Sequence, residues 1–314
     1  MIIKKPKFWD TRKITLISFL LIPFTIPIRI NNFLYNFFSK YKTKKIITIC
    51  VGNIYLGGTG KTPTTIKLFQ IFKKMKIRVA TAKKYYSSHK DEITLLQNKT
   101  KFLLGKKRID IVEKAIKNKY KIIIFDDGLQ DNKIDYKLKF VCFDSFSWIG
   151  NGQLIPSGPL REKLISIKKY DGAFIKNLDK PKFQLVKKLK KINPKIKIFN
   201  SRYIIKNLKK FNLSKKYIIF SGIGNPDNFE LLLKKYKFKI IKHIKYPDHY
   251  NYTNEDIIKI IKVANKAKAK IITTEKDHIK LPKNYQKKIN VLNIDLMIDN
   301  KKELIDFLKI KLYE

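Results

Sequence analysis

The sequence feature that most constrains the fold is a glycine-rich turn between an apolar run and a helix-like segment. The apolar run covers residues 46–51, the helix-like segment covers 64–74, and the turn reads Gly52-Asn53-Ile54-Tyr55-Leu56-Gly57-Gly58-Thr59-Gly60-Lys61-Thr62-Pro63. A strand, a glycine turn and a helix N-terminus together form a phosphate cradle, because backbone N–H groups converge on phosphate oxygens and the helix dipole adds positive charge. This order predicts that the chain binds a nucleoside triphosphate.

Within this turn, two side chains carry specific roles. Lys61 is expected to reach the β- and γ-phosphates, and the Thr62 hydroxyl is expected to bind Mg²⁺. The pattern G-x-x-x-x-G-K-[ST] is not fully met, because Tyr55 stands where its first glycine is expected. The paired glycines are closer to a variant loop found in other ATPases. The residues predicted to hold the nucleotide are Tyr55, Leu56, Gly57, Gly58, Thr59, Gly60, Lys61 and Thr62.

The strong positive charge has two interpretations. The 314 residues carry a formal net charge of +45, which usually indicates a nucleic acid or an anionic membrane as partner. Only six of the 70 basic residues are arginine, however, and lysine, isoleucine and asparagine are abundant throughout. Arginine is the better reader of phosphate and guanine, so this bias favours compositional drift over a nucleic-acid surface. The charge would still favour an anionic bilayer.

Cysteine and histidine give no sign of a disulfide framework or a zinc site. Cys50 and Cys142 both lie in apolar, strand-like runs, as expected of small buried side chains in a reducing compartment. The four histidines are scattered and have no zinc-ligand spacing.

The N-terminal segment, residues 1–45, is predicted to associate with a membrane. Ile14 to Ile28 is a run of fifteen uncharged residues, interrupted by Pro23 and Pro27 and flanked by basic residues. As a straight helix it would span about 22 Å, short of the roughly 30 Å hydrocarbon core. No small-residue cleavage site follows, which argues against a signal peptide. We expect an interfacial helix that docks on the bilayer, and a buried core helix is the alternative.

From residue 46 onward, apolar runs alternate with helical patterns, which predicts an α/β fold with a parallel sheet covered on both faces. We expect a P-loop NTPase-like α/β/α domain over residues 46–200 and a second, smaller α/β domain over 201–314. The second domain opens on another strand and glycine turn at 217–226 that lacks Lys-Thr, so a second nucleotide site is not expected. The apolar run 290–297 is expected to form one strand.

Two further segments of the first domain carry candidate ligands. A buried strand at 121–127 ends in Asp126 and Asp127, where ligands of open α/β sheets bind. One of these carboxylates could hold Mg²⁺ opposite Thr62, although a solvated strand end is the plain alternative. The Gly/Pro-rich loop 150–162 has Arg161 as its only cation, which either clamps a phosphate or forms a salt bridge with an acid.

Taken together, these motifs resemble the tetraacyldisaccharide 4′-kinases of lipid A biosynthesis. Each motif is modest alone, but seven occur in order over nearly the whole chain. They are VGNIYLGGTGKTP (51–63), DE with ITLL (91–96), DDGLQ (126–130), GNGQLIPSGPLRE (150–162), SGIGNPDNF (221–229), YPDHY (246–250) and TEKDHIK (274–280).

The resemblance implies transfer of the ATP γ-phosphate to the 4′-hydroxyl of a tetraacyl glucosamine disaccharide 1-phosphate, at the cytoplasmic face of the inner membrane. It implies two α/β/α domains joined by a two-stranded linker, with ATP and Mg²⁺ in the first and the active site in the cleft between them. Asp91 and His249 match the catalytic carboxylate–histidine pair, with Lys61 acting on the phosphates. Thr62, Asp126 and Asp127 match the metal residues. The matched substrate contacts are Lys83, Tyr85, Gln130 and Arg161.

The chemistry of these residue types agrees with the resemblance. A sugar hydroxyl is a poor nucleophile, and a carboxylate held by an imidazole can accept its proton. Without the resemblance, Asp91 would be an ordinary acid at a helix start, and His249 would be a surface residue in a Pro-Asp turn.

The sequence departs from the family pattern in two places. The family usually has Ser-Arg-Gly-Tyr-Gly where this chain has Ala82-Lys83-Lys84-Tyr85-Tyr86, so a cation and an aromatic remain but the glycines are lost. The family also tends to have His after DDGLQ, where this chain has Asp131. Both departures concern substrate contacts and leave the nucleotide chemistry intact.

Two other functions compete with the kinase. A switch-type P-loop ATPase that handles a protein cargo would share the paired glycines, but such proteins often carry a lysine at the position of Leu56. A nucleic-acid binder is disfavoured, since arginine is scarce and no reader motif is present. The expected partners are the lipid substrate and an anionic membrane surface, with no nucleic acid and no obligate protein partner.

Overall fold

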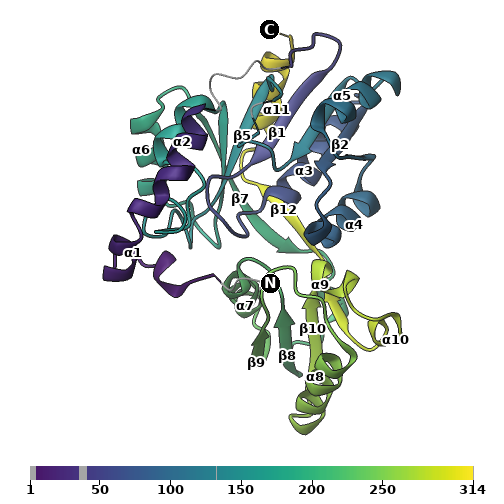
Figure 1. Ribbon diagram of the computed structural model, residues 1–314. Coiled ribbons are helices and arrows are strands. Elements are labelled where there is room, and N and C mark those ends of the chain that lie inside the picture. Colours follow the sequence, from purple (N-terminus) through teal and green to yellow (C-terminus); the bar gives the residue numbers. More distant parts are fainter. Residues whose placement is uncertain (1–4, 35–40, 132, 314) are drawn as a thin grey trace. The chain divides into compact units, whose positions relative to one another are not determined.

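Two β-sheets organise the chain, and each forms the centre of its own unit (Figure 1). The structure is a computed structural model that describes residues 5–34, 41–131 and 133–313. The larger unit comprises residues 5–85, 99–202 and 297–313, and the smaller unit comprises 86–98 and 203–296. The chain passes from the larger to the smaller unit after residue 202, while residues 297–313 belong to the larger unit and residues 86–98 to the smaller one.

The sheet of the larger unit has the strand order β12-β7-β6-β5-β1-β4-β2-β3 and is parallel from β7 to β3. Its strands are β1 Ile47–Gly52, β2 Val79–Lys84, β3 Phe102–Gly105, β4 Ile122–Asp126, β5 Leu138–Asp144, β6 Gly172–Lys176, β7 Lys197–Ile205 and β12 Ile294–Ile298. The central strands β1 and β4 are buried almost throughout, as their continuous apolar runs predict.

Helices cover both faces of this sheet and produce two hydrophobic cores. One core contains residues of α3 (Lys61–Lys74) and α11 (Lys301–Tyr313), and the other contains residues of α5 (Arg108–Lys117) and α6 (Phe183–Ile192). The prediction of a three-layer α/β/α domain is therefore confirmed. Cys50 and Cys142 are free and buried in these cores, as expected.

The smaller unit has a four-stranded parallel sheet in the order β11-β10-β8-β9. Residues of α7 and α8 contribute to separate cores of this unit, and a capping box between Thr253 and Asp256 begins α8. Its elements are η3 Ser87–His89, α4 Lys90–Lys99, η5 Leu208–Lys210, β8 Lys216–Ser221, α7 Pro226–Lys235, β9 Lys239–Lys245, α8 Asn254–Lys266, β10 Lys270–Thr274, α9 Glu275–Ile279, α10 Lys283–Gln286 and β11 Asn290–Leu292.

The prediction of one strand over 290–297 is wrong. This run forms two strands, β11 and β12, that belong to different sheets. The change occurs at Asn293, whose N–H donates to Asn207 Oδ1 at 3.0 Å, while Asn207 Nδ2 donates to Val291 O at 2.8 Å. The apolar pattern continues across this junction, so the sequence does not reveal it.

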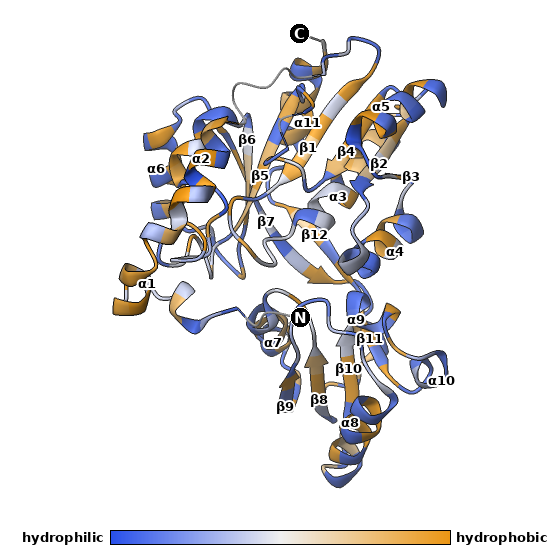
Figure 2. Ribbon diagram, viewed as in Figure 1, coloured by the Kyte–Doolittle hydropathy of each residue, from blue (hydrophilic) through white to orange (hydrophobic). Residues whose placement is uncertain are grey.

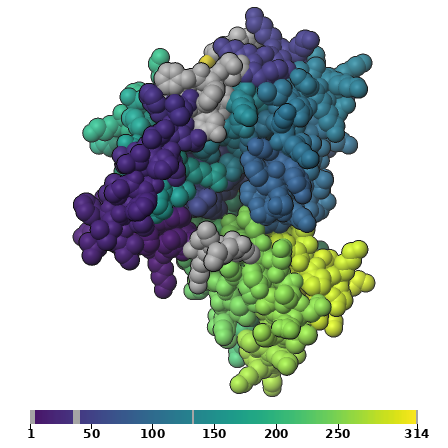
Figure 3. All heavy atoms as spheres, viewed as in Figure 1, coloured from purple at the N-terminus to yellow at the C-terminus, as the bar shows by residue number. Residues whose placement is uncertain are grey.

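Residues 5–34 of the N-terminal segment belong to the larger unit and contact its Gly/Pro-rich loop (Figure 3). Trp9 Nε1 donates to Pro156 O at 2.9 Å, the Ser18 hydroxyl donates to Ser157 O at 2.6 Å, and Asn32 Nδ2 donates to Arg161 O at 3.0 Å. The segment contains η1 Lys7–Trp9, α1 Leu16–Leu20, η2 Pro23–Thr25 and α2 Ile26–Leu34, and η4 Leu164–Lys169 follows the loop. Among the described residues, no helix combines the length and apolar character needed to cross a bilayer.

Candidate active site

The glycine-rich turn connects β1 to the first residue of α3, as predicted. Gly60 has a φ of +90°, a conformation that glycine adopts readily, and it brings Lys61 to the first position of the helix. The buried Asn53 side chain braces the turn, because its Nδ2 donates to Thr59 Oγ1 at 3.0 Å and to Gly57 O at 3.2 Å. The sequence reading did not identify this bracing role of Asn53.

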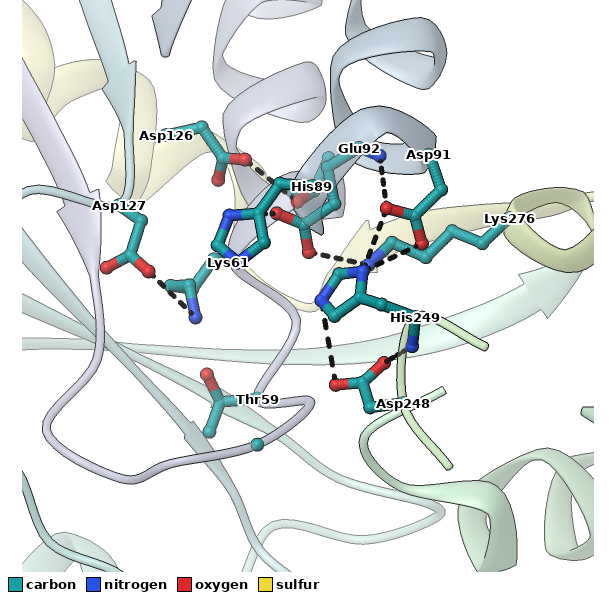
Figure 4. Close-up of polar contacts among 12 residues, drawn as sticks. Thr59, Lys61, His89, Asp91, Glu92, Asp126, Asp127, Asp248, His249 and Lys276 are labelled. Atoms are coloured by element: carbon teal, nitrogen blue, oxygen red, sulfur yellow. Dashed lines mark hydrogen bonds and ion pairs between the residues drawn. The ribbon is translucent and has the colours of Figure 1, made fainter. Parts of the chain in front are cut away.

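Lys61 and Arg161 both face Asp127. Lys61 Nζ lies 3.5 Å from Asp127 Oδ2, and Arg161 Nη1 donates to both carboxylate oxygens of Asp127 at 3.1 Å (Figure 4 draws the Lys61 contact). Burial acts to raise the pKa of Asp127, but the charges of Lys61 and Arg161 outweigh it and hold that pKa well below its usual range. Of the two interpretations of Arg161, the salt bridge to an acid is the one observed.

Asp126 lies beside Thr62, so the second carboxylate faces the hydroxyl of the turn. Thr62 Oγ1 donates to Asp126 Oδ2 at 2.9 Å, and Asp126 is fully buried at the end of β4. Among the described residues, no group of three or more His, Cys, Asp and Glu side chains could hold a metal ion. A hydroxyl and one carboxylate nevertheless fit Mg²⁺, which prefers oxygen and usually completes its shell with water and substrate phosphates.

Lys83 is buried against the same carboxylate. Its Nζ lies 3.1 Å from Asp126 Oδ2, and its side chain is only 2% exposed. A substrate contact by Lys83 would therefore require its ammonium group to leave Asp126. Tyr85, which lies with Lys83 in the segment 82–86 that departs from the family pattern, is 44% exposed.

Gln130 connects the turn to the Gly/Pro-rich loop. Its Nε2 donates to Asn53 O at 2.9 Å and to Glu162 Oε1 at 2.7 Å, and its Oε1 accepts from Arg161 Nη1 at 3.3 Å. Glu162 is held in turn by the Tyr170 hydroxyl at 3.0 Å. The four predicted substrate residues thus divide into the linked pair Gln130 and Arg161, the buried Lys83 and the exposed Tyr85.

Asp131, which departs from the family pattern, forms an ion pair with Arg108. Arg108 Nη2 also donates to the backbone oxygen of Asp127 at 2.6 Å, and Asp127 has a φ of +65°. Arg108 thereby supports the strained backbone of a predicted site residue. The sequence reading missed Arg108, since it gives no local signal beyond being one of six arginines.

In the smaller unit, Asp91 and His249 form a hydrogen-bonded pair (Figure 4). His249 Nδ1 lies 2.9 Å from Asp91 Oδ1 and 3.1 Å from Oδ2. Asp91 is 2% exposed at its side chain and lies in the first turn of α4, while His249 has a φ of +58° in the loop after β9. The family resemblance implied this pairing, and the structure brings the two residues together within one unit.

Neighbouring charges set the protonation of this pair. Burial acts to raise the pKa of Asp91, but the hydrogen bond from His249 and the charge of Lys276 leave that pKa below its ordinary value. Burial acts to lower the pKa of His249, but the bond to Asp91 leaves it above its ordinary value. Both shifts favour a carboxylate beside an imidazolium.

Three further residues surround the pair. Lys276 Nζ lies 2.6 Å from Glu92 Oε1, and the ring of His89 stacks on His249 at a centroid distance of 4.9 Å (Figure 4). Burial acts to lower the pKa of Lys276, but Glu92 and Asp91 raise it above its ordinary value, so Lys276 stays charged. Lys276 belongs to the TEKDHIK motif, which the sequence reading quoted without assigning it a role.

The larger unit is a P-loop NTPase-like domain. It has a parallel sheet, a glycine turn between β1 and α3, and Lys61 and Thr62 at the start of the helix. Comparisons with known proteins identify the family. The family model for LpxK, tetraacyldisaccharide-1-P 4′-kinase, matches residues 14–313. The chain belongs to this family of kinases.

Relatives and a solved structure agree with this assignment. The chain is 42% identical to the tetraacyldisaccharide 4′-kinase of Pelagibacter ubique over 100% of this chain and 99% of that protein. It is 32% identical to the enzyme of that name from Rickettsia typhi over 94% of each. A crystal structure of LpxK from Aquifex aeolicus in complex with ATP matches with a TM-score of 0.69 and 22% identity, covering 95% of this chain and 100% of that one, which supports the fold.

Proposed function

We propose that this chain transfers the γ-phosphate of ATP to the 4′-hydroxyl of a tetraacyl glucosamine disaccharide 1-phosphate, which forms lipid IVA in lipid A biosynthesis. The observation that carries this proposal is the Asp91–His249 pair, in a chain of the tetraacyldisaccharide 4′-kinase family. A P-loop alone would suit any nucleotide hydrolase, whereas a buried carboxylate held by an imidazole supplies the base that a sugar hydroxyl needs.

The proton steps follow from the state of this pair. Asp91 is the base: as the sugar oxygen attacks the γ-phosphorus, the O–H bond breaks and its proton passes to the carboxylate. The bond between the γ-phosphorus and the bridging oxygen breaks, and ADP leaves with that electron pair. His249 orients Asp91 through Nδ1 and stabilises its charge, since the two atoms are already 2.9 Å apart.

The phosphate chemistry belongs to the larger unit. Lys61 at the start of α3 would stabilise the charge of the β- and γ-phosphates, and Arg161 is the second cation available there. Thr62 and Asp126 would hold Mg²⁺, with Asp127 as a further oxygen donor, and the ion would neutralise phosphate charge when bound. Lys61 would exchange its contact with Asp127 for the phosphates as the nucleotide binds, which would leave the Asp127 carboxylate available to the metal.

The decisive experiment is incubation of the full-length chain with labelled ATP, Mg²⁺ and the disaccharide 1-phosphate lipid. We expect a labelled, bisphosphorylated lipid, and none when EDTA removes the metal. Absence of that product with an active relative as positive control would reject the proposal. The same assay tests the alternative, a switch-type ATPase acting on a protein cargo. Rapid ATP hydrolysis without acceptor lipid would favour that alternative, whereas Leu56 before the paired glycines argues against it.

We also propose that the chain works at an anionic membrane surface, on the cytoplasmic face of the inner membrane. Ten large apolar side chains of residues 14–34 are about half exposed or more, and Figure 2 draws α1 largely in orange. The most exposed are Leu16 at 75%, Phe24 at 66% and Phe19 at 63%. Basic residues flank the segment, and each one near an anionic bilayer contributes about 1 kcal/mol of attraction. An interfacial segment of this kind fits an enzyme whose substrate is a lipid.

Vesicle flotation tests this docking. The double variant Leu16→Glu/Phe19→Glu should lose at least tenfold in partitioning to vesicles with anionic lipid, because two apolar anchors become charged. Its activity on detergent-dispersed substrate should change little. Ile241→Glu, which alters an apolar side chain of β9 that is 52% exposed, is the matched control and should leave partitioning unchanged. Equal loss in both variants would contradict a docking role for the N-terminal segment.

A further inference from the structure

A fully buried carboxylate, Asp277, organises the part of the smaller unit behind the Asp91–His249 pair. Asp277 Oδ1 accepts from Gly222 N and from the Tyr252 hydroxyl, each at 3.0 Å. Its Oδ2 accepts from the Thr274 hydroxyl at 2.7 Å, next to the start of α9. Because an unpaired charge is costly to bury, Asp277 requires a cation.

Lys280 supplies that cation and also reaches the pair. Its Nζ lies 2.9 Å from Asp277 Oδ1 and 4.0 Å from Asp91 Oδ2, and its side chain is 7% exposed. The same Nζ donates to Gly222 O at 3.2 Å. The ammonium group of Lys280 therefore contacts the Asp277 carboxylate and the backbone oxygen of Gly222, and it lies near the Asp91 carboxylate.

The Gly222 oxygen links Lys280 to the other half of the pair. His249 N donates to this oxygen at 3.2 Å, and His249 has the left-handed φ of +58°. A Cβ added at Gly222 would lie 2.9 Å from Pro247 O, so the loop that carries His249 packs directly on this glycine. The Gly222 oxygen thus accepts from both Lys280 and His249, and it fixes the backbone that aims the imidazole.

We infer that Lys280, with Asp277, is a positioning residue for the Asp91–His249 pair. It holds the Asp91 carboxylate and the loop of His249 in fixed positions relative to each other. This inference rests on the proposed function for its catalytic meaning, but its geometry does not. Lys280 is the last residue of the TEKDHIK motif.

Lys280 affects the pair mainly by fixing its geometry, and much less through the electrostatic effect of its charge. Its charge is already balanced by Asp277 at 2.9 Å, so the two together present little net charge to Asp91. The charged and titratable groups that face the pair are otherwise Lys276, Glu92, Asp248 and His89. A purely structural role, in which Lys280 only neutralises Asp277, is the competing explanation.

A charge-balanced double variant separates the two explanations. Lys280→Met alone leaves Asp277 buried without a cation and should lower the melting temperature. Lys280→Met/Asp277→Asn removes both charges and keeps an acceptor oxygen for Gly222 N, so its melting temperature should recover. If Lys280 positions the pair, kcat of the double variant stays about 10- to 100-fold below that of the unaltered chain, with KM for ATP within twofold. Recovery of kcat together with stability would overturn the inference.

A second readout does not depend on activity. In the double variant, the imidazole of His249 should titrate at lower pH, because its bond to Asp91 raises its pKa and that bond would be loosened. Histidine NMR of the full chain measures this, and an unchanged titration would also overturn the inference. Lys283→Met, an exposed lysine of α10, is the matched control and should change neither measurement. If the unaltered chain makes no phosphorylated lipid, the proposed function fails while the titration still decides the role of Lys280.

Discussion

The glycine-rich turn and the Asp91–His249 pair assemble their functional groups in opposite ways. The turn is one continuous segment, in which a buried strand, glycines and a helix start bring Lys61 and Thr62 to one place. The pair joins residues 158 positions apart, from the first turn of α4 and from a loop after β9. The first site is encoded locally, and the second exists only when the smaller unit is folded.

The two regions also differ in what holds their charges. Lys61 and Arg161 converge on Asp127, so the carboxylate of the larger unit is compensated by cations that phosphate would also attract. Asp91 is compensated by an imidazole, with Lys276 farther out. The first arrangement suits exchange of partners on nucleotide binding, whereas the second suits a base that keeps one partner throughout. Substitutions in the two regions should therefore impair activity in different ways.

The largest effect is expected from Lys61→Met. This variant should reduce phosphoryl transfer to background, because the only helix-start cation in the turn is removed and stabilisation by one such group is typically worth 10²–10³ in kcat or more. The lipid kinase assay with labelled ATP measures it. Lys73→Met, an exposed lysine near the end of the same helix, controls for a general effect of charge and should keep full activity. An active Lys61→Met chain would mean that the turn does not act on the transferred phosphate.

Substitutions in the Asp91–His249 pair are expected to have a smaller effect, which falls on kcat and not on KM for ATP. Asp91→Asn and His249→Ala should each lower kcat by about 10²-fold or more, with little change in KM for ATP, since general-base catalysis contributes 10²–10⁴. The two substitutions together should lower kcat little more than the more harmful single substitution does, because the two residues act as one unit.

Steady-state kinetics with both substrates varied makes this distinction. Glu255→Gln, an exposed acid in the first turn of α8, is the matched control and should not alter kcat. Simple addition of the two losses, or a rise in KM for ATP alone, would separate Asp91 from His249 in function.

Local motifs made much of this architecture predictable. The alternating apolar runs predicted the parallel sheet, and residues 52–63 predicted a glycine turn between a strand and a helix, because both patterns depend on neighbours in the sequence. The division of β11 from β12 at Asn293 and the burial of Lys83 against Asp126 depend on tertiary contacts instead. The Arg108–Asp131 ion pair belongs to the same class, since residue 131 alone indicates a departure but not its partner. Family resemblance, and not local pattern, identified Asp91 and His249.

The smallest predicted effect concerns stability and pH, and it tests whether the pair is an ion pair in the folded chain. The pKa of Asp91 is below its ordinary value of 3.8 in the folded state, so its contribution is present above that value and is lost as pH falls through the lowered pKa. The pKa of His249 is above its ordinary value of 6.5, so its contribution is complete below pH 6.5 and is lost as pH rises through the raised pKa. The two conditions overlap between about pH 4 and 6.5.

Asp91→Asn should therefore destabilise the chain most within this window, by about 1.5–3 kcal/mol, the range for a hydrogen bond to a charged group. The difference in unfolding free energy from the unaltered chain should shrink as pH rises through the raised pKa of His249, because the imidazolium is lost. Urea unfolding at pH 5.5 and 8.5 measures it, with Glu255→Gln as the control that should show no such window. A difference that grows towards pH 8.5 would mean that Asp91 is paired through neutral imidazole, and the contrast with the permanently charged partners of Asp127 would then be sharper still.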